Sequence, residues 1–155
     1  YLKWTEKEVE RIASTLNAIM AQRLVRMICP DCKVEKPVDA DITASLKKQF
    51  DLDALMKVLE DSKLTNGAKK FEDLKFYYGQ GCDKCSRTGY KGRIGVHEIL
   101  ENTPQIEELI VKRATSQDIE KQAVADGMIT MWQDGFIKAV AGQTTIEEIL
   151  RVTKE

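Results

Sequence analysis

The sequence of 155 residues contains no long hydrophobic run and only one histidine. Because nowhere do about 18 apolar residues follow one another, no transmembrane helix is expected. The amino terminus has neither the apolar core of a signal peptide nor an initiator methionine, so we expect the chain to be a piece of a longer protein. The 24 basic and 25 acidic side chains nearly cancel, whereas DNA-binding domains are usually strongly basic. A nucleic-acid partner is therefore not expected.

The sequence also lacks the motifs of several enzyme classes. It has no Gly-x-x-x-x-Gly-Lys-Ser/Thr loop for phosphates, and its glycine-rich run at Gly79 leads into a cysteine pair and not into a helix. No pair of carboxylates and no nucleophile with an adjacent base stands out. We expect His97 to be an ordinary strand residue, with a ligand or a base as the alternatives. This chain is therefore not expected to be an enzyme.

The spacing of apolar residues predicts an α+β fold that is mainly helical. Repeats of three and four residues predict one helix over residues 6–28, beginning after Thr5 and ending before Pro30. A loop is expected over 33–42, and a second helix, inserted as an arm, over 43–60.

Residues 61–100 are predicted to form turns and short strands. The dipeptide Asn66-Gly67 indicates a turn. Strands are predicted at 74–78 and 93–100, and the glycines clustered between them require sharp turns. We therefore expect a short β-hairpin in this part of the chain.

From residue 103 onward the pattern is helical and predicts a small bundle of about four short helices. Starts are indicated by Thr103-Pro104, by Thr115 or Ser116, and by Thr144 or Thr145; ends are indicated by Gly127 and Gly142. Three segments are thus expected: a helix over 1–28, a four-cysteine subdomain with an inserted helix over 29–100, and a C-terminal helical subdomain over 101–155.

All four cysteines fall into two matched pairs, each with two residues between its members. The pairs are Cys29 with Cys32 and Cys82 with Cys85. Two such pairs are typical of a structural zinc ion in a tetrahedral thiolate shell. The 49 residues between the pairs are acceptable because the entropy cost of closing a loop grows only logarithmically with its length. Four thiolates leave no open position for a substrate, so catalytic zinc is not expected.

Two disulfide bonds and a redox-active pair are the alternatives to zinc. Disulfides are typical of secreted proteins, and the sequence shows no secretion signal. A redox-active pair would explain one of the two cysteine pairs but not both. The pattern therefore favours structural zinc.

Three segments of the chain resemble the type II secretion and type IV pilus-assembly ATPases. They run from Ala13 to Arg26 and on to the first cysteine pair; from Gly81 through the second pair to Gly95 and Glu98; and from Gly127 through Asp134-Gly135 to Thr153. The segments follow the family's order, which makes the resemblance specific. Residues 33–78 lie outside it.

The resemblance implies a hexameric cytoplasmic motor, peripheral to the inner membrane, with a RecA-like ATPase core. Such a motor energises pilin or pseudopilin assembly through an inner-membrane platform protein. The four cysteines match the family's zinc ligands in a C-terminal subdomain, whereas its phosphate loop, and with it the ATP and magnesium site, lies upstream of this sequence. Residues 6–26 would be the last helix of the core or its link to this subdomain. The alternative function is a free-standing zinc-ribbon module that binds protein or nucleic acid.

A basic segment surrounds the second cysteine pair. Residues 63–93 hold eight basic and three acidic side chains. Four of the basic residues lie on or beside turns that a metal ion would hold rigid: Lys84, Arg87, Lys91 and Arg93. A rigid cationic loop loses little conformational entropy on binding. These residues are the predicted docking face, which the resemblance assigns to the platform protein with help from anionic lipid. Pairing with an acidic tail and simple solvation are the alternatives.

Overall fold

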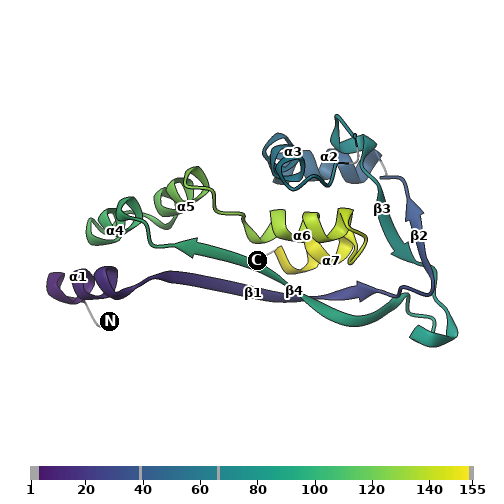
Figure 1. Cartoon of the computed structure of the whole chain (residues 1–155), viewed down its shortest axis with the longest axis horizontal. Helices are drawn as coiled ribbons and strands as arrows, with labels where there is room; N and C mark the ends of the chain where they lie inside the picture. The colour runs from purple at the N-terminus through teal and green to yellow at the C-terminus, as the bar shows by residue number, and fades with distance from the viewer. Residues whose placement is uncertain (1–3, 39, 66, 154–155) are drawn as a thin grey trace. The chain divides into compact units, whose positions relative to one another are not determined.

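The computed structural model describes residues 4–38, 40–65 and 67–153, which form two compact units (Figure 1). Unit 1 comprises residues 1–21 and 97–130, and unit 2 comprises residues 22–96 and 131–155. The strands β1 (Ala18–Ile28) and β4 (Tyr90–Glu101) pair with each other, and each contributes residues to both units.

In its described residues, unit 1 contains three helices, each of which directly follows a threonine. They are α1 (Glu6–Thr15), α4 (Pro104–Val111) and α5 (Ser116–Ala125). The hydroxyls of Thr5, Thr103 and Thr115 each accept a backbone N–H from the first turn of the helix that follows. The predicted starts at Thr103-Pro104 and Thr115 are thereby confirmed.

Asn102 joins the end of β4 to the end of α1. Its side-chain amide donates hydrogen bonds to the carbonyls of Ala13 and Leu16, each at 2.8 Å. These carbonyls belong to the last turn of α1 and to its C-cap residue, where no further helical N–H is available. A backbone hydrogen bond from Asn102 to Asn17 at 2.9 Å continues the contact.

Unit 2 combines a small antiparallel sheet with four helices. The strands are β2 (Lys33–Lys36) and β3 (Phe76–Gly79); the helices are α2 (Ala40–Gln49), α3 (Leu52–Asp61), α6 (Met131–Val140) and α7 (Ile146–Thr153). In the sheet Lys33 pairs with Gly79, and Lys36 pairs with Phe76. Two 3-10 helices, at Phe71–Asp73 and Asp83–Cys85, lie on either side of β3 in the sequence.

The hydrophobic core of unit 2 is built from helices that are far apart in the sequence. Its fully buried members include Leu46 of α2, Leu55 and Leu59 of α3, Phe136 of α6 and Ile149 of α7. The ring of Phe136 contacts those of Phe50, Phe71 and Trp132 at centroid distances of 6.0 to 6.2 Å. Helices α2 and α3 are therefore part of a core with α6 and α7. That this segment is inserted into a four-cysteine subdomain stays a prediction.

The helix predicted over 6–28 is wrong beyond Thr15. Helix α1 ends there, and residues 18–28 form β1. The apolar spacing in this segment does not match a buried helical stripe, because Ile19 and Leu24 are each 50% exposed whereas Val25 is fully buried. Pairing with β4 decides the conformation, since strand formation depends on distant partners that spacing does not reveal.

Residues 43–60 form parts of two helices, and the single predicted helix is wrong. The chain breaks at Asp51, whose carboxylate accepts the N–H groups of Asp53 and Ala54 at 3.1 and 3.0 Å. An aspartate that caps the next helix competes with continuation of the previous one, and this is why α3 starts afresh at Leu52.

The strands predicted at 74–78 and 93–100 are confirmed as β3 and β4, with their ends shifted by one to three residues. These two strands do not form a hairpin with each other. Strand β3 pairs with β2, which occupies part of the expected loop at 33–42, and β4 pairs with β1. Of the predicted turn, Asn66 lies outside the described residues, and Gly67 has a φ of 87°.

The four predicted C-terminal helices are present, with Gly127 and Gly142 in left-handed conformations after α5 and α6. Helices α4 and α5 belong to unit 1, and α6 and α7 belong to unit 2. The compact units are thus composed differently from three consecutive segments, and the domain boundaries after 28 and 100 stay a prediction.

Candidate metal centre

The first cysteine pair lies in the turn between β1 and β2. Cys29 directly follows β1, and Cys32 directly precedes β2. The N–H of Cys32 donates to the carbonyl of Cys29 at 3.3 Å, which closes the turn, and the N–H of Cys29 donates to the carbonyl of Gly89 at 2.9 Å. The first knuckle, residues 29–32, is therefore hydrogen-bonded to Gly89, the residue that directly precedes β4.

The second knuckle, residues 82–85, follows β3 and includes a 3-10 helix. The carbonyl of Cys82 accepts the N–H groups of Cys85 and Arg87 at 3.1 and 2.8 Å. Ser86 and Arg87 adopt left-handed conformations, with φ of 51° and 60°. The chain thereby turns tightly enough to bring both sulfurs of the pair to one side.

Glycines allow the segments that flank the second knuckle to meet. A Cβ atom on Gly79 would lie 2.0 Å from the carbonyl oxygen of Gly89, and one on Gly89 would lie 2.4 Å from that of Gly79. A Cβ atom on Gly81 would lie 2.6 Å from the carbonyl oxygen of Arg87. Any side chain at these positions would push the base of the loop apart.

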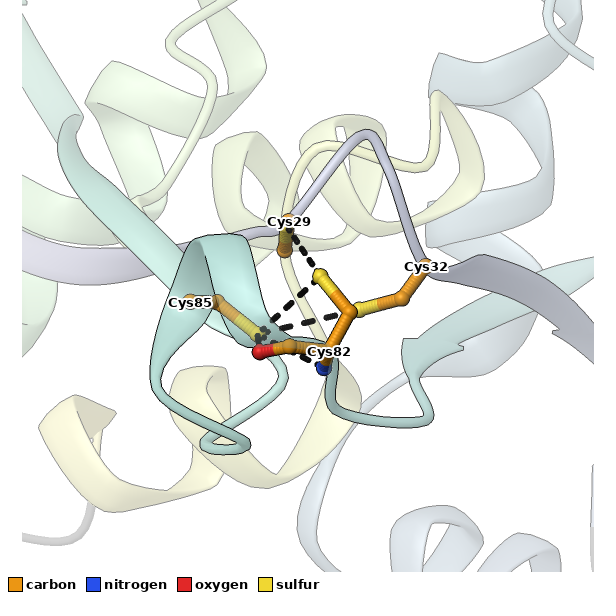
Figure 2. Close-up of side chains that lie close together, drawn as sticks. All are labelled: Cys29, Cys32, Cys82 and Cys85. Carbon is orange, nitrogen blue, oxygen red and sulfur yellow. Dashed lines mark hydrogen bonds between the residues drawn. The ribbon is translucent and has the colours of Figure 1, made fainter.

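The four cysteine sulfurs converge on one point between the knuckles (Figure 2). All four lie within 4.8 Å of one another. The Sγ atoms of Cys29 and Cys82 are 3.9 Å apart, those of Cys32 and Cys85 are 3.9 Å apart, and those of Cys82 and Cys85 are 3.7 Å apart. A tetrahedral zinc ion with Zn–S bonds of about 2.3 Å requires sulfurs about 3.8 Å apart. The spacing therefore fits a single tetrahedral ion.

Backbone N–H groups favour negative charge on one of the sulfurs. Cys82 and Gly89 donate their N–H groups to Cys85 Sγ at 3.2 and 3.3 Å, and these bonds lower the pKa of Cys85 to about 6. Burial instead raises the pKa of Cys32 to about 12, and it also raises that of Cys82. Thiols with a raised pKa, such as those of Cys32 and Cys82, lose their protons readily only beside a cation. The four sulfurs together therefore fit a soft divalent metal.

His97 lies in β4 and is not a member of the cysteine cluster. Among the described residues, the metal-capable group consists of the four cysteines alone. This agrees with the expectation of an ordinary strand residue over that of a ligand.

The structure places the predicted docking residues beside the second knuckle. Lys91 and Arg93 are exposed on β4, whereas Lys84 and Arg87 lie in the knuckle loop. Lys84 forms an ion pair with Asp31 at 2.5 Å, and Arg87 approaches Asp83 at 3.7 Å. The cationic residues are thus gathered on one segment, and two of them have acidic neighbours.

A buried carboxylate that contacts β1 was not found from the sequence. Glu148 of α7 is 1% exposed, and its oxygens accept hydrogen bonds from the side chains of Arg26 at 2.8 Å and Arg151 at 2.9 and 3.1 Å. Its second oxygen also accepts the backbone N–H of Arg26 at 2.8 Å. Burial by itself would raise the pKa of Glu148, but the hydrogen bonds from Arg151 and Arg26 hold it at about 2.

Further contacts attach the start of α7 to the two strands that carry the knuckles. The Arg26 guanidinium lies 4.1 Å from the centre of the Tyr90 ring, and the hydroxyl of Tyr90 contacts that of Thr145 at 3.1 Å. The hydroxyl of Thr144 donates to the carbonyl of Arg26 at 2.8 Å. Thr145 thus has two roles, because its hydroxyl also accepts the N–H of Glu148 and so caps α7 at the predicted helix start.

Comparison with known proteins identifies the family. A family model described as type II/IV secretion system protein matches residues 4–151, and the chain therefore belongs to this family. The match also runs across residues 33–78, which lie outside the three segments whose motifs resemble the family.

Two kinds of secretion and pilus ATPase are among the relatives. The type II secretion system ATPase E of Vibrio cholerae is 40% identical over 144 residues, which are 93% of this chain and 24% of that protein. The type IV pilus assembly ATPase PilB of Pseudomonas aeruginosa is 35% identical over 93% of this chain and 22% of its own length. PilB of Thermus thermophilus is 34% identical, with 14% of its length covered. The chain thus spans about a quarter or less of these relatives.

None of the helices within residues 4–38, 40–65 and 67–153 has both the length and the apolar character that crossing a bilayer requires.

Proposed function

We propose that this chain is the non-catalytic, zinc-binding C-terminal region of a hexameric ATPase motor that powers pilin or pseudopilin assembly or type II secretion. The observation that carries the proposal is the convergence of four cysteine sulfurs in a member of the secretion family. Relatives several times longer than this chain favour a part of a motor over a free-standing zinc-ribbon module.

Cys29, Cys32, Cys82 and Cys85 are the proposed zinc ligands. Their spacing supports one tetrahedral ion, and bound zinc would supply the charge that keeps the buried thiolates deprotonated. The ion would tie the end of β1 to the loop after β3, and its role is structural because no ligand position is left for chemistry.

The region does not itself hydrolyse ATP. The sequence contains no phosphate loop, and the ATP and magnesium sites belong to the part of the parent protein outside it. The region acts instead as an interaction surface on the cytoplasmic side of the inner membrane, where the parent hexamer works as a peripheral protein.

The proposed docking face consists of Lys84, Arg87, Lys91 and Arg93, and its partner is the cytoplasmic part of the inner-membrane platform protein. The four side chains are exposed and follow one another within ten residues. Bound zinc would hold the loop in one conformation, so that little conformational entropy is lost on docking. Anionic lipid headgroups next to the platform would add to the attraction.

The experiment measures binding of the zinc-loaded chain to the platform's cytoplasmic domain at low salt. The variant R87E/K91E/R93E changes three cations of the docking face and leaves the pair of Lys84 with Asp31 in place. The control K57E/K112E/K121E makes the same change in net charge at exposed positions elsewhere. The proposal expects binding to fall at least tenfold in the first variant and less than twofold in the control. Equal binding by both variants would contradict the docking face.

A further inference from the structure

An ion pair crosses from one cysteine knuckle to the other. Asp31 lies between the cysteines of the first knuckle, and Lys84 holds the matching place between those of the second. The Lys84 ammonium donates to the Asp31 carboxylate at 2.5 Å. The other carboxylate oxygen of Asp31 is 3.9 Å from the sulfur of Cys29. The pair therefore bridges the two loops whose relative position sets the shape of the metal centre.

The two charges have opposite effects on a cluster of thiolates. Four thiolates around a divalent ion leave a net charge of about −2 on the cluster. A nearby ammonium stabilises that charge, whereas a nearby carboxylate destabilises it. Asp31 alone would thus weaken metal binding, and it can strengthen binding only by holding Lys84 and the second knuckle in place.

We propose that Asp31 and Lys84 form a clasp between the knuckles that holds the zinc ion in the site. This inference rests on the proposed zinc centre and adds two positioning residues to it. Asp31 orients the ammonium of Lys84 toward the cluster, and the pair limits the separation of the two loops, which is the motion that releases the ion.

The size of the effect separates a clasp from an ordinary surface ion pair. The two side chains are 32% and 67% exposed, and pairs of this exposure change equilibria by only about two- to fivefold. Residues that orient metal ligands change metal affinity by about 10- to 100-fold. The clasp therefore predicts a change of at least tenfold in the zinc dissociation constant.

The experiment measures the zinc content of the chain and its zinc dissociation constant by competition with a chromogenic chelator. The variants are K84M, D31N, K84R and the exchanged pair D31K/K84D. The control is K112M, because Lys112 forms an ion pair of the same length with Glu108 and is about equally exposed. Lys112 directly follows helix α4 in unit 1, whereas all four cysteines belong to unit 2.

The clasp predicts at least tenfold weaker zinc binding in K84M and in D31N. It predicts near-native binding in K84R, partial recovery in D31K/K84D, and a change of less than twofold in K112M. The direction of the change in zinc affinity in D31N is decisive. If the Asp31 carboxylate acted only through its charge, its neutralisation would make zinc binding tighter. Tighter or unchanged binding in D31N, in a chain that carries zinc, overturns the clasp alone. A wild-type chain without zinc affinity overturns the metal centre and the clasp together.

Discussion

Gly79 and Gly89 contact each other through their backbones at the base of the second knuckle, and neither position has room for a Cβ atom. The contact brings the end of β3 beside the residue whose N–H donates to the sulfur of Cys85. The geometry of the cysteine cluster thus depends on two residues outside it.

Replacement of Gly89 by alanine is expected to disrupt the second knuckle. The new Cβ would lie 2.4 Å from the backbone of Gly79, and φ at this position is 78°. The matched control is G92A, because Gly92 has a φ of 81° and its nearest neighbouring atom is 3.9 Å away. We expect G92A to lower the free energy of unfolding by about 1–2 kcal/mol from backbone strain alone. G89A should lower it by clearly more and should also weaken zinc binding. Equal losses of stability in the two variants, measured by chemical denaturation, would show that the backbone contact is unimportant.

The ion pairs of Glu148 predict a loss of stability in acid. The folded-state pKa of about 2 lies below the ordinary value of 4.5, so the carboxylate stabilises the fold above about pH 4.5. This contribution is lost as the pH falls from about 4.5 to about 2, and it amounts to at most about 3 kcal/mol.

The variant E148Q is expected to be less stable by about 2–3 kcal/mol near neutral pH, because a buried charge-assisted network is broken. Its stability should also fall less steeply than that of the wild type below pH 4.5. Acid can release zinc from both proteins, so the comparison is between their curves of unfolding free energy against pH. Parallel curves would argue against the assigned role of Glu148.

Removal of zinc should loosen the knuckles and the segments attached to them. The N–H groups of Cys82 and Gly89, which donate to the sulfur of Cys85, should exchange with solvent faster in the chelated chain. Helices α4 and α5 of unit 1 contain no ligand and should keep their protection. Uniform loss of protection across the chain in hydrogen–deuterium exchange would instead indicate that the metal supports both units.

The chain should not bind Mg-ATP with appreciable affinity. A phosphate site needs a cradle of backbone N–H groups with a lysine, and no such loop is present in the sequence. Calorimetric titration should detect no binding at micromolar concentrations, whereas a full-length relative that contains the loop provides the positive control. Micromolar binding by the chain would contradict the proposed non-catalytic role.

The cysteine cluster could be predicted because its signal is local. Each pair has two intervening residues, and two matched pairs in one chain already favour a single shared site. The structure brings the pairs together, as the spacing indicated. Glu148 could not be found in this way, because its partner Arg26 lies 122 residues away in the sequence. A glutamate three residues after a threonine indicates only a capping box.

The helical termini of the second half were predicted well for the same reason. Thr103, Thr115 and Gly142 act through bonds or backbone angles within a few residues. The prediction for residues 18–28 failed because pairing with β4 decides that they form a strand. Their apolar spacing alone is compatible with a helix or with a strand. The sequence therefore predicted features that neighbouring residues determine, but it did not predict strand β1 or which strands pair with each other.

The proposed function depends above all on one zinc ion held by the four cysteines. The decisive measurement is elemental analysis of the purified chain, combined with thiol counting after denaturation. We expect one zinc ion per chain, bound through Cys29, Cys32, Cys82 and Cys85, and four free thiols once the metal is chelated. A stably folded chain that contains no metal and has its four sulfurs paired as disulfides would contradict it.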